Sequence, residues 1–149
     1  MSGYPPVPEL LPHAGPAVLL DSILEQQPDA LRARLRITSA HPYFEPGRGV
    51  PVWVGIELMA QAIAAHAGLN SLRDGAPPRK GMLLGTRRYE ASVSWFTEGS
   101  ELEVEAQREF GEDAGGVAAC VCRIRSGGRE LANATLIIMQ IDEKDIPKP

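Results

Sequence analysis

The stretch PVWVGIELMAQAIAAHAGL, residues 51–69, decides the fold class. It is apolar nearly all round, begins with Pro51 and reaches Gly68, and these residue types commonly start and stop a helix. A helix that is apolar on every side is a buried one. The stretch therefore predicts one long buried helix of about eighteen residues.

The segments before this helix predict strands and a loop. Residues 17–27 and 31–38 are two β-like runs, and in the second apolar residues alternate with arginines, as in a half-buried strand with a basic outer face. Residues 40–49, AHPYFEPGRG, hold two prolines and two glycines and predict a shaped loop. Five prolines within the first sixteen residues predict an extended lead-in.

The segments after the helix predict a sheet. Residues 70–81 predict a loop, and four strand-like runs follow with turns between them, at residues 82–96, 101–110, 115–128 and 130–141. The order strand, strand, loop, helix, four strands predicts an antiparallel sheet with one long helix against a face. We therefore expect an α+β fold and a single domain over residues 1–149.

Composition and charge exclude several classes of partner. The 149 residues are 44% hydrophobic and 23% charged, with a net charge of −4 and a pI near 5.4. This balance gives no basic face for nucleic acid or an anionic membrane. We find no apolar stretch near the ~20 residues of a membrane span and no signal peptide, so we expect a cytoplasmic protein.

The two cysteines predict core packing and not chemistry. Cys120 and Cys122 lie two apart, so on a strand they share a face and are too close for an unstrained disulfide. No further cysteine supports a metal site. We expect two small buried side chains and no metal.

Three polar side chains interrupt the predicted helix. Glu57 and Gln61 lie four residues apart on one stripe. A carboxylate there is costly to bury unless it is paired or protonated, and a carboxyl under such constraint suits general acid chemistry. Alternatively, the stripe faces solvent or a subunit boundary. His66, near the expected helix C-terminus, suits a structural role in which an imidazolium favours the dipole.

Two further histidines precede the helix. His41 opens the proline- and glycine-rich loop, where a side chain can be aimed at a site, although a loop histidine is more often solvated. His13 lies between Pro12 and Pro16, which predicts a turn against the core.

Two segments resemble the β-hydroxyacyl-ACP dehydratases of the FabZ/FabA type. LLPHAGPAVLLDSI (residues 10–23) resembles their N-terminal signature, and PVWVGIELMAQAIA (residues 51–64) resembles their hot-dog helix, with Glu57 at the acidic catalytic position. The resemblance implies a hot-dog fold, a dimer, and elimination of water from a 3-hydroxyacyl thioester on acyl carrier protein's phosphopantetheine. No cofactor is implied.

The resemblance also implies roles for residues of the site. A loop histidine takes the α-proton, the helix carboxyl of the other subunit handles the hydroxyl, and backbone N–H groups at the helix start stabilise the thioester oxygen. Here Glu57 and His41 are the catalytic candidates. Val52, Trp53 and Gln61 are the substrate-binding candidates.

The usual catalytic motif is altered in this chain. The family places a histidine fourteen residues before the acid, but Tyr43 stands there and His41 stands sixteen before Glu57. The glycine that normally follows the helix proline is Val52. The base is therefore either His41, reaching the site through a two-residue insertion, or a group of a partner subunit.

Residues 50–69 followed by LLGTRRYE (residues 83–90) resemble the ApeP-like dehydratase subunits of aryl-polyene and related lipid biosynthesis, which are thought to pair with a second hot-dog protein. We thus expect a homodimer or heterodimer. Two alternatives to a dehydratase stay open, a hot-dog acyl thioesterase and a non-catalytic subunit that binds acyl carrier protein. Arg87 and Arg88 offer charge to a carrier protein or its phosphate, or form a solvated strand end.

Overall fold

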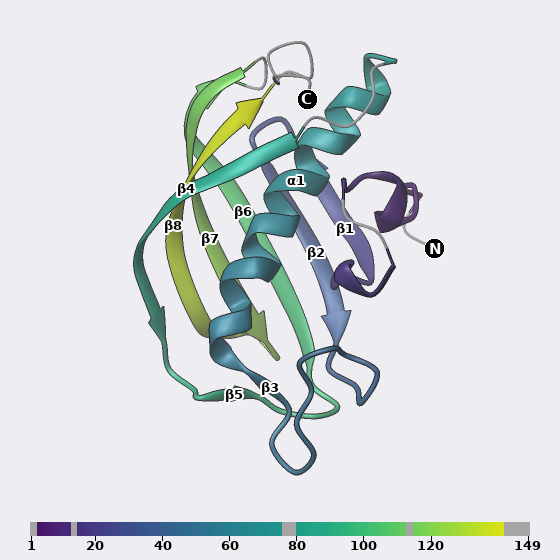
Figure 1. Ribbon diagram of the computed structural model, residues 1–149, viewed down its shortest axis with the longest axis vertical. Helices are drawn as coiled ribbons and strands as arrows, with labels where there is room; N and C mark the ends of the chain where they lie inside the picture. Colours follow the sequence, from purple (N-terminus) through teal and green to yellow (C-terminus); the bar gives the residue numbers. More distant parts are fainter. Residues whose placement is uncertain (1–2, 13–14, 76–79, 113–114, 142–149) are drawn as a thin grey trace, which may run out of the picture.

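One long helix lies along the concave face of a curved antiparallel sheet (Figure 1). The computed structural model describes residues 3–12, 15–75, 80–112 and 115–141, so His13 lies outside the described residues. Across the sheet the strands are β1 (Ser22–Gln27), β2 (Ala30–Arg36), β6 (Glu101–Glu112), β7 (Gly115–Ser126), β8 (Arg129–Ile141) and β4 (Lys80–Ala91). The expected α+β arrangement is confirmed.

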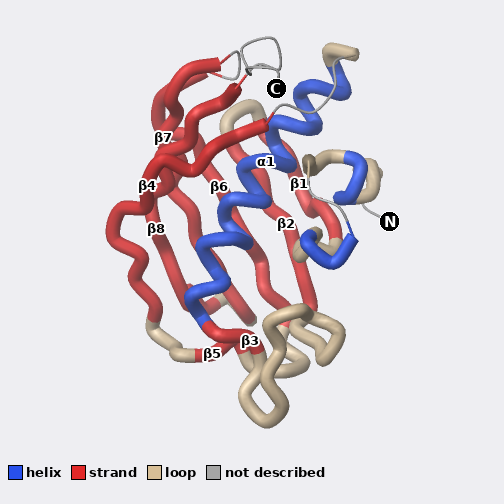
Figure 2. Tube along the Cα trace, in the orientation of Figure 1, coloured by secondary structure: helices blue, strands red, loops and turns tan. Residues whose placement is uncertain are grey.

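The helix α1 (Gly55–Arg73) follows a short 3-10 turn, η3 (Val52–Val54). Beside that turn, β3 (Val50–Pro51) pairs with β5 (Trp95–Phe96) in a small second sheet (Figure 2). Two more 3-10 turns, η1 (Val7–Glu9) and η2 (Gly15–Ala17), belong to the N-terminal lead-in and lie on the β1 side of α1.

The core lies between α1 and the inner face of the sheet. On β2 the apolar positions Leu31, Ala33 and Leu35 are buried and alternate with arginines, as predicted. Val52–Arg73 is long and apolar enough to cross a membrane, contrary to our expectation of no such stretch. Because 61% of that window is buried within the fold, the segment is the core helix.

The predicted end of the helix is wrong. Gly68 was expected to terminate it, but α1 continues to Arg73, and Asp74 caps it through its N–H to the Asn70 carbonyl. Gly68 has a different role, since a Cβ there would lie 2.1 Å from the Leu10 carbonyl oxygen. A glycine inside this helix therefore lets the lead-in approach the helix backbone.

Several strand boundaries also differ from the prediction by one or two residues, and two strands differ by more. Residues 17–21 precede β1 without strand structure, because the chain there leaves the η2 turn. Residues 82–96 are two strands and not one, because the chain leaves β8 after the Ser92 N–H bonds the Leu131 carbonyl. The Ser94 carbonyl then accepts from the Val52 N–H, which brings β5 to the helix start.

Cys120 and Cys122 are buried on β7 and unbridged, as predicted. Burial raises the pKa of the Cys122 thiol, so it stays protonated.

Candidate functional site

Glu57 lies in the first turn of α1 with its side chain exposed on the single chain. The Gln61 Nε2 donates to Glu57 Oε1 at 3.0 Å, which fixes the carboxylate through the predicted i to i+4 contact. The structure divides the predicted stripe, because Glu57 is exposed whereas Gln61 is buried. The Glu57 carboxylate is thus accessible on the single chain and is held in place by a buried amide.

Gln61 is fully buried behind Glu57 and is committed to internal hydrogen bonds. Its Nε2 also donates to the Ala17 carbonyl at 2.6 Å, and its Oε1 accepts from the Leu19 N–H at 2.9 Å. The expected role of Gln61 in substrate binding thus changes to positioning, because the amide ties the lead-in to the helix and orients the carboxylate. The contact with Ala17 and Leu19 was not predicted.

The start of the helix offers fewer backbone donors than expected. The Val52 N–H donates to the Ser94 carbonyl at 3.1 Å, so this expected oxyanion donor is already used. Trp53 is 60% exposed, and its ring meets Tyr43 edge-on with centroids 5.3 Å apart. Of the two predicted donors, Trp53 alone remains.

Tyr89 of β4 holds this turn in place and was missed by the sequence analysis. Its hydroxyl donates to the Val52 carbonyl at 2.5 Å, and burial raises its pKa to about 12, so it remains a donor at neutral pH. A Cβ on Gly55 would lie 2.2 Å from that hydroxyl oxygen. Gly55 and Tyr89 together therefore set the geometry of the helix start.

His41 does not present a basic nitrogen in this arrangement. Its Nδ1 accepts from the Tyr43 N–H at 3.1 Å, and its Nε2 is buried without a hydrogen-bond partner among the described residues. Because Nδ1 is an acceptor, the proton of the neutral ring lies on Nε2. Within the described part of the chain, no hydrogen bond or ion pair joins His41 to Glu57.

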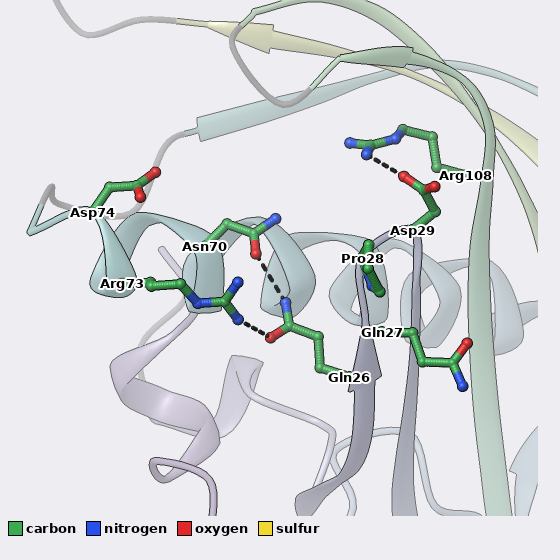
Figure 3. Close-up of a pocket in the computed structure, with 8 residues that line it drawn as sticks. All are labelled: Gln26, Gln27, Pro28, Asp29, Asn70, Arg73, Asp74 and Arg108. Atoms are coloured by element: carbon green, nitrogen blue, oxygen red, sulfur yellow. Dashed lines mark hydrogen bonds and ion pairs between the residues drawn. The ribbon is translucent and has the colours of Figure 1, made fainter.

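A polar hollow of about 470 Å³ lies at the opposite end of α1 (Figure 3). Gln26 accepts from Arg73 and donates to Asn70, both at 3.0 Å. Gln26 also donates to His66 Nδ1, and His66 Nε2 meets the Pro28 carbonyl. These contacts give His66 the predicted structural role, and the hollow lies roughly 20 Å from Glu57 along the helix.

The described ranges contain no group of three or more His, Cys, Asp or Glu side chains that could hold a metal ion.

The family of ApeP-like proteins, described as ApeP dehydratase, matches residues 5–147. The chain belongs to the ApeP-like dehydratase family. Comparison with curated protein sequences gives no match.

Solved structures place this ApeP-like protein among hot-dog folds. It is 26% identical to a chain of the dehydratase heterocomplex ApeI:P from Xenorhabdus doucetiae, with a TM-score of 0.88 and 95% of each chain covered. A hypothetical thioesterase with coenzyme A from Streptococcus pneumoniae TIGR4 shares 10% identity, with a TM-score of 0.61 over 80% of this chain and 84% of that one. PaaI from Escherichia coli shares 12% identity, with a TM-score of 0.59 over 79% and 81%. The hot-dog fold is confirmed, and the last two likenesses concern the fold alone.

Replacing Gln61 with Leu in the ApeP-like protein should lower its stability by about 2–4 kcal/mol. The Ala17 carbonyl and the Leu19 N–H would lose their buried partner, and Leu cannot supply one. Urea denaturation measures the change. Exposed Gln27, which contacts Glu25, provides the control, and a Gln27→Leu variant should stay within about 0.5 kcal/mol of wild type. Equal losses in the two variants would contradict the anchoring role of Gln61.

Acid should weaken the fold through His41. Burial lowers the pKa of His41 below its ordinary value of 6.5, with a smaller opposing influence from Asp21. The unfolded chain then binds a proton more readily than the folded chain, so stability falls as the pH drops through about 6.5. We expect a His41→Asn variant, whose Oδ1 can still accept from Tyr43, to lose less stability than wild type between about pH 7.5 and pH 5.5. Parallel denaturation curves for the two proteins across this range would contradict the prediction.

Proposed function

We propose that this protein is the subunit of a 3-hydroxyacyl-ACP dehydratase that supplies the acid, Glu57, while a second hot-dog subunit supplies the base. The observation that carries the proposal is the ordered, exposed Glu57 carboxylate at the start of α1, together with a loop histidine, His41, that presents no basic nitrogen. The family match and the likeness to a dehydratase heterocomplex support the same reaction and the need for two different chains.

The elimination assigns a definite step to each group. The partner's base removes the α-proton of the thioester, and the electrons of that C–H bond form the Cα–Cβ double bond. The Glu57 carboxyl gives a proton to the departing β-hydroxyl, which leaves as water. Gln61 donates to Glu57 Oε1 and so stabilises the carboxylate that results. The Trp53 N–H is the remaining candidate for the thioester oxygen, which gains negative charge as the α-proton leaves.

The exposed edge of the sheet supports a partner subunit. β4 is one of the two edge strands of the sheet, and its successive residues Met82, Leu83 and Leu84 are 50%, 42% and 48% exposed. On the outer face Met82 of β4 lies opposite Met139 of β8. Met139 in turn lies opposite Val117 of β7, which is exposed. An exposed apolar sheet edge is a ready template for another chain. We propose that a second hot-dog chain pairs along β4.

Product analysis tests the proposal. The purified protein is incubated with a 3-hydroxyacyl thioester on acyl carrier protein, alone and with a co-encoded hot-dog partner. We expect the enoyl thioester with the partner and little or none without it. A free acid as the product would identify a thioesterase instead. If no product forms under either condition, the interpretation that stands is a non-catalytic subunit that binds acyl carrier protein.

A further inference from the structure

Strand β4 carries a bulge that was not predicted. Arg87 lies opposite Thr135 of β8, and Glu90 lies opposite Asn133. An advance of three residues on β4 therefore matches an advance of two residues on β8, so β4 has one extra residue at this point. At the bulge Arg88 has a φ of +50°, in the left-handed region that an arginine rarely adopts. Such strain costs roughly 1–3 kcal/mol and persists where the surroundings impose it, commonly at functional sites.

The bulge changes which side chains share a face. In a regular strand neighbouring residues point to opposite faces. Here Arg87 and Arg88 both line one hollow of about 390 Å³ on the outer face, and its polar lining also includes Glu90, Arg123, Glu130, Asn133 and Thr135. Tyr89 instead reaches inward to the Val52 carbonyl at the helix start. Two consecutive arginines therefore line one cavity, and they directly precede Tyr89, the residue that holds the start of the helix.

The two arginines differ from most of the other cations of the outer face. Arg34 pairs with Glu101 at 2.7 Å, and Arg32 pairs with both Glu25 and Glu103. Throughout the described residues, Arg87 and Arg88 have neither an ion pair nor a side-chain hydrogen bond.

Two acidic residues, Glu90 and Glu130, line the hollow with the arginines. Among the described residues no ion pair joins Glu90 to Arg87 or Arg88. Glu130 accepts from Asn133 at 3.2 Å and pairs with Arg123 at 3.3 Å. The hollow thus holds two guanidinium groups whose charge no carboxylate of the described fold neutralises by direct contact.

We propose that the hollow beside Arg87 and Arg88 binds a phosphate ester, the phosphodiester of the pantetheine arm that carries the acyl thioester. This inference rests on the proposed function. Guanidinium groups match phosphate oxygens in bidentate geometry, and the bulge brings two of them together on one face. The site stands on the edge strand, next to the surface where we place the partner chain.

A comparison of 4′-phosphopantetheine with pantetheine tests the inference, because the two probes differ only in the phosphate. Binding to the full chain is measured by calorimetric titration. We expect 4′-phosphopantetheine to bind at least about tenfold more tightly than pantetheine, and inorganic phosphate to compete with it. Equal binding of the two probes would overturn the inference. The measurement needs no turnover, so its failure is distinct from failure of the elimination assay.

Arg88→Gly is the sharpest variant, because glycine accepts the positive φ and keeps the bulge while the guanidinium is removed. We expect an unchanged or higher melting temperature and at least about tenfold weaker phosphopantetheine binding. Arg34→Gln removes the same charge elsewhere on the outer face and should leave binding as in wild type. Equal binding by wild type and Arg88→Gly would refute the site.

Carrier proteins distinguish the source of the anion. A carrier protein bearing the pantetheine arm should bind at least about tenfold more tightly than the same protein without it. If both forms bind equally and Arg88→Gly weakens both, the arginines contact the acidic protein surface and the phosphate-ester assignment is wrong.

Discussion

Replacing Glu57 with Gln should lower the rate of enoyl thioester formation by at least about 100-fold, because a positioned general acid contributes roughly 10²–10⁴-fold. The fold should survive the change. Glu57 is exposed, and the Oε1 of a glutamine can still accept from Gln61. The measurement is the kcat of the two-subunit complex with a 3-hydroxyacyl carrier-protein substrate, together with the melting temperature of each variant.

Glu98→Gln provides the matched control for Glu57→Gln. Glu98 is an exposed carboxylate in the turn before β6, and the same chemical change there should leave kcat as in wild type. If the Glu57→Gln complex turns over at the wild-type rate, Glu57 is not the acid and the chain serves as a non-catalytic subunit. A loss of activity accompanied by unfolding would instead show that the carboxylate is structural.

Gly68→Ala should destabilise the fold by about 2–3 kcal/mol. Helix propensity alone predicts a gain of up to about 1 kcal/mol from this substitution, so the expected sign is reversed. The reason is the close approach of the lead-in, since the new Cβ would lie 2.1 Å from the Leu10 carbonyl oxygen. Backbone cannot move aside as a flexible side chain can. Urea denaturation gives the difference in the free energy of unfolding.

Gly85→Ala is the control for the glycine prediction. Gly85 lies in β4 without a positive φ, and a Cβ added there would meet nothing within 4 Å. Its replacement should therefore change the free energy of unfolding by less than about 0.5 kcal/mol. A Gly68→Ala protein as stable as wild type would show that the lead-in yields at little cost.

Local pattern was sufficient for most of the fold. The existence of the buried helix and the alternation of β2 follow from periodicity, and the Glu57–Gln61 contact follows from helical spacing. The predicted helix start at Pro51 is wrong, because Pro51 precedes the 3-10 turn η3 and α1 begins at Gly55. The helix end did not follow, because Gly68 is required by a tertiary contact with Leu10 and not by a helix terminus. In the local sequence, a glycine that ends a helix looks the same as a glycine inside a helix that allows another segment to approach.

Contacts between distant segments account for the rest of the site. The partners of Gln61, Ala17 and Leu19, lie more than 40 residues away in sequence, and no local pattern links them. The bulge at Arg88 changes which face Tyr89 occupies, and strict alternation along the strand cannot anticipate it. The hydrogen bond from the Tyr43 N–H to His41 likewise depends on the folded loop.

The position of β4 also constrains how the chain folds as it is made. β4 follows α1 directly in the sequence, yet within the described residues it pairs in the sheet with β8 alone, with Met82 opposite Met139 and Ala91 opposite Ala132. During synthesis β4 therefore stays unpaired until β8 has left the ribosome, and Met82, Leu83 and Leu84 stay uncovered until then. Chains that stop before β8 will expose this apolar strand on both edges, and they are the species most prone to aggregate.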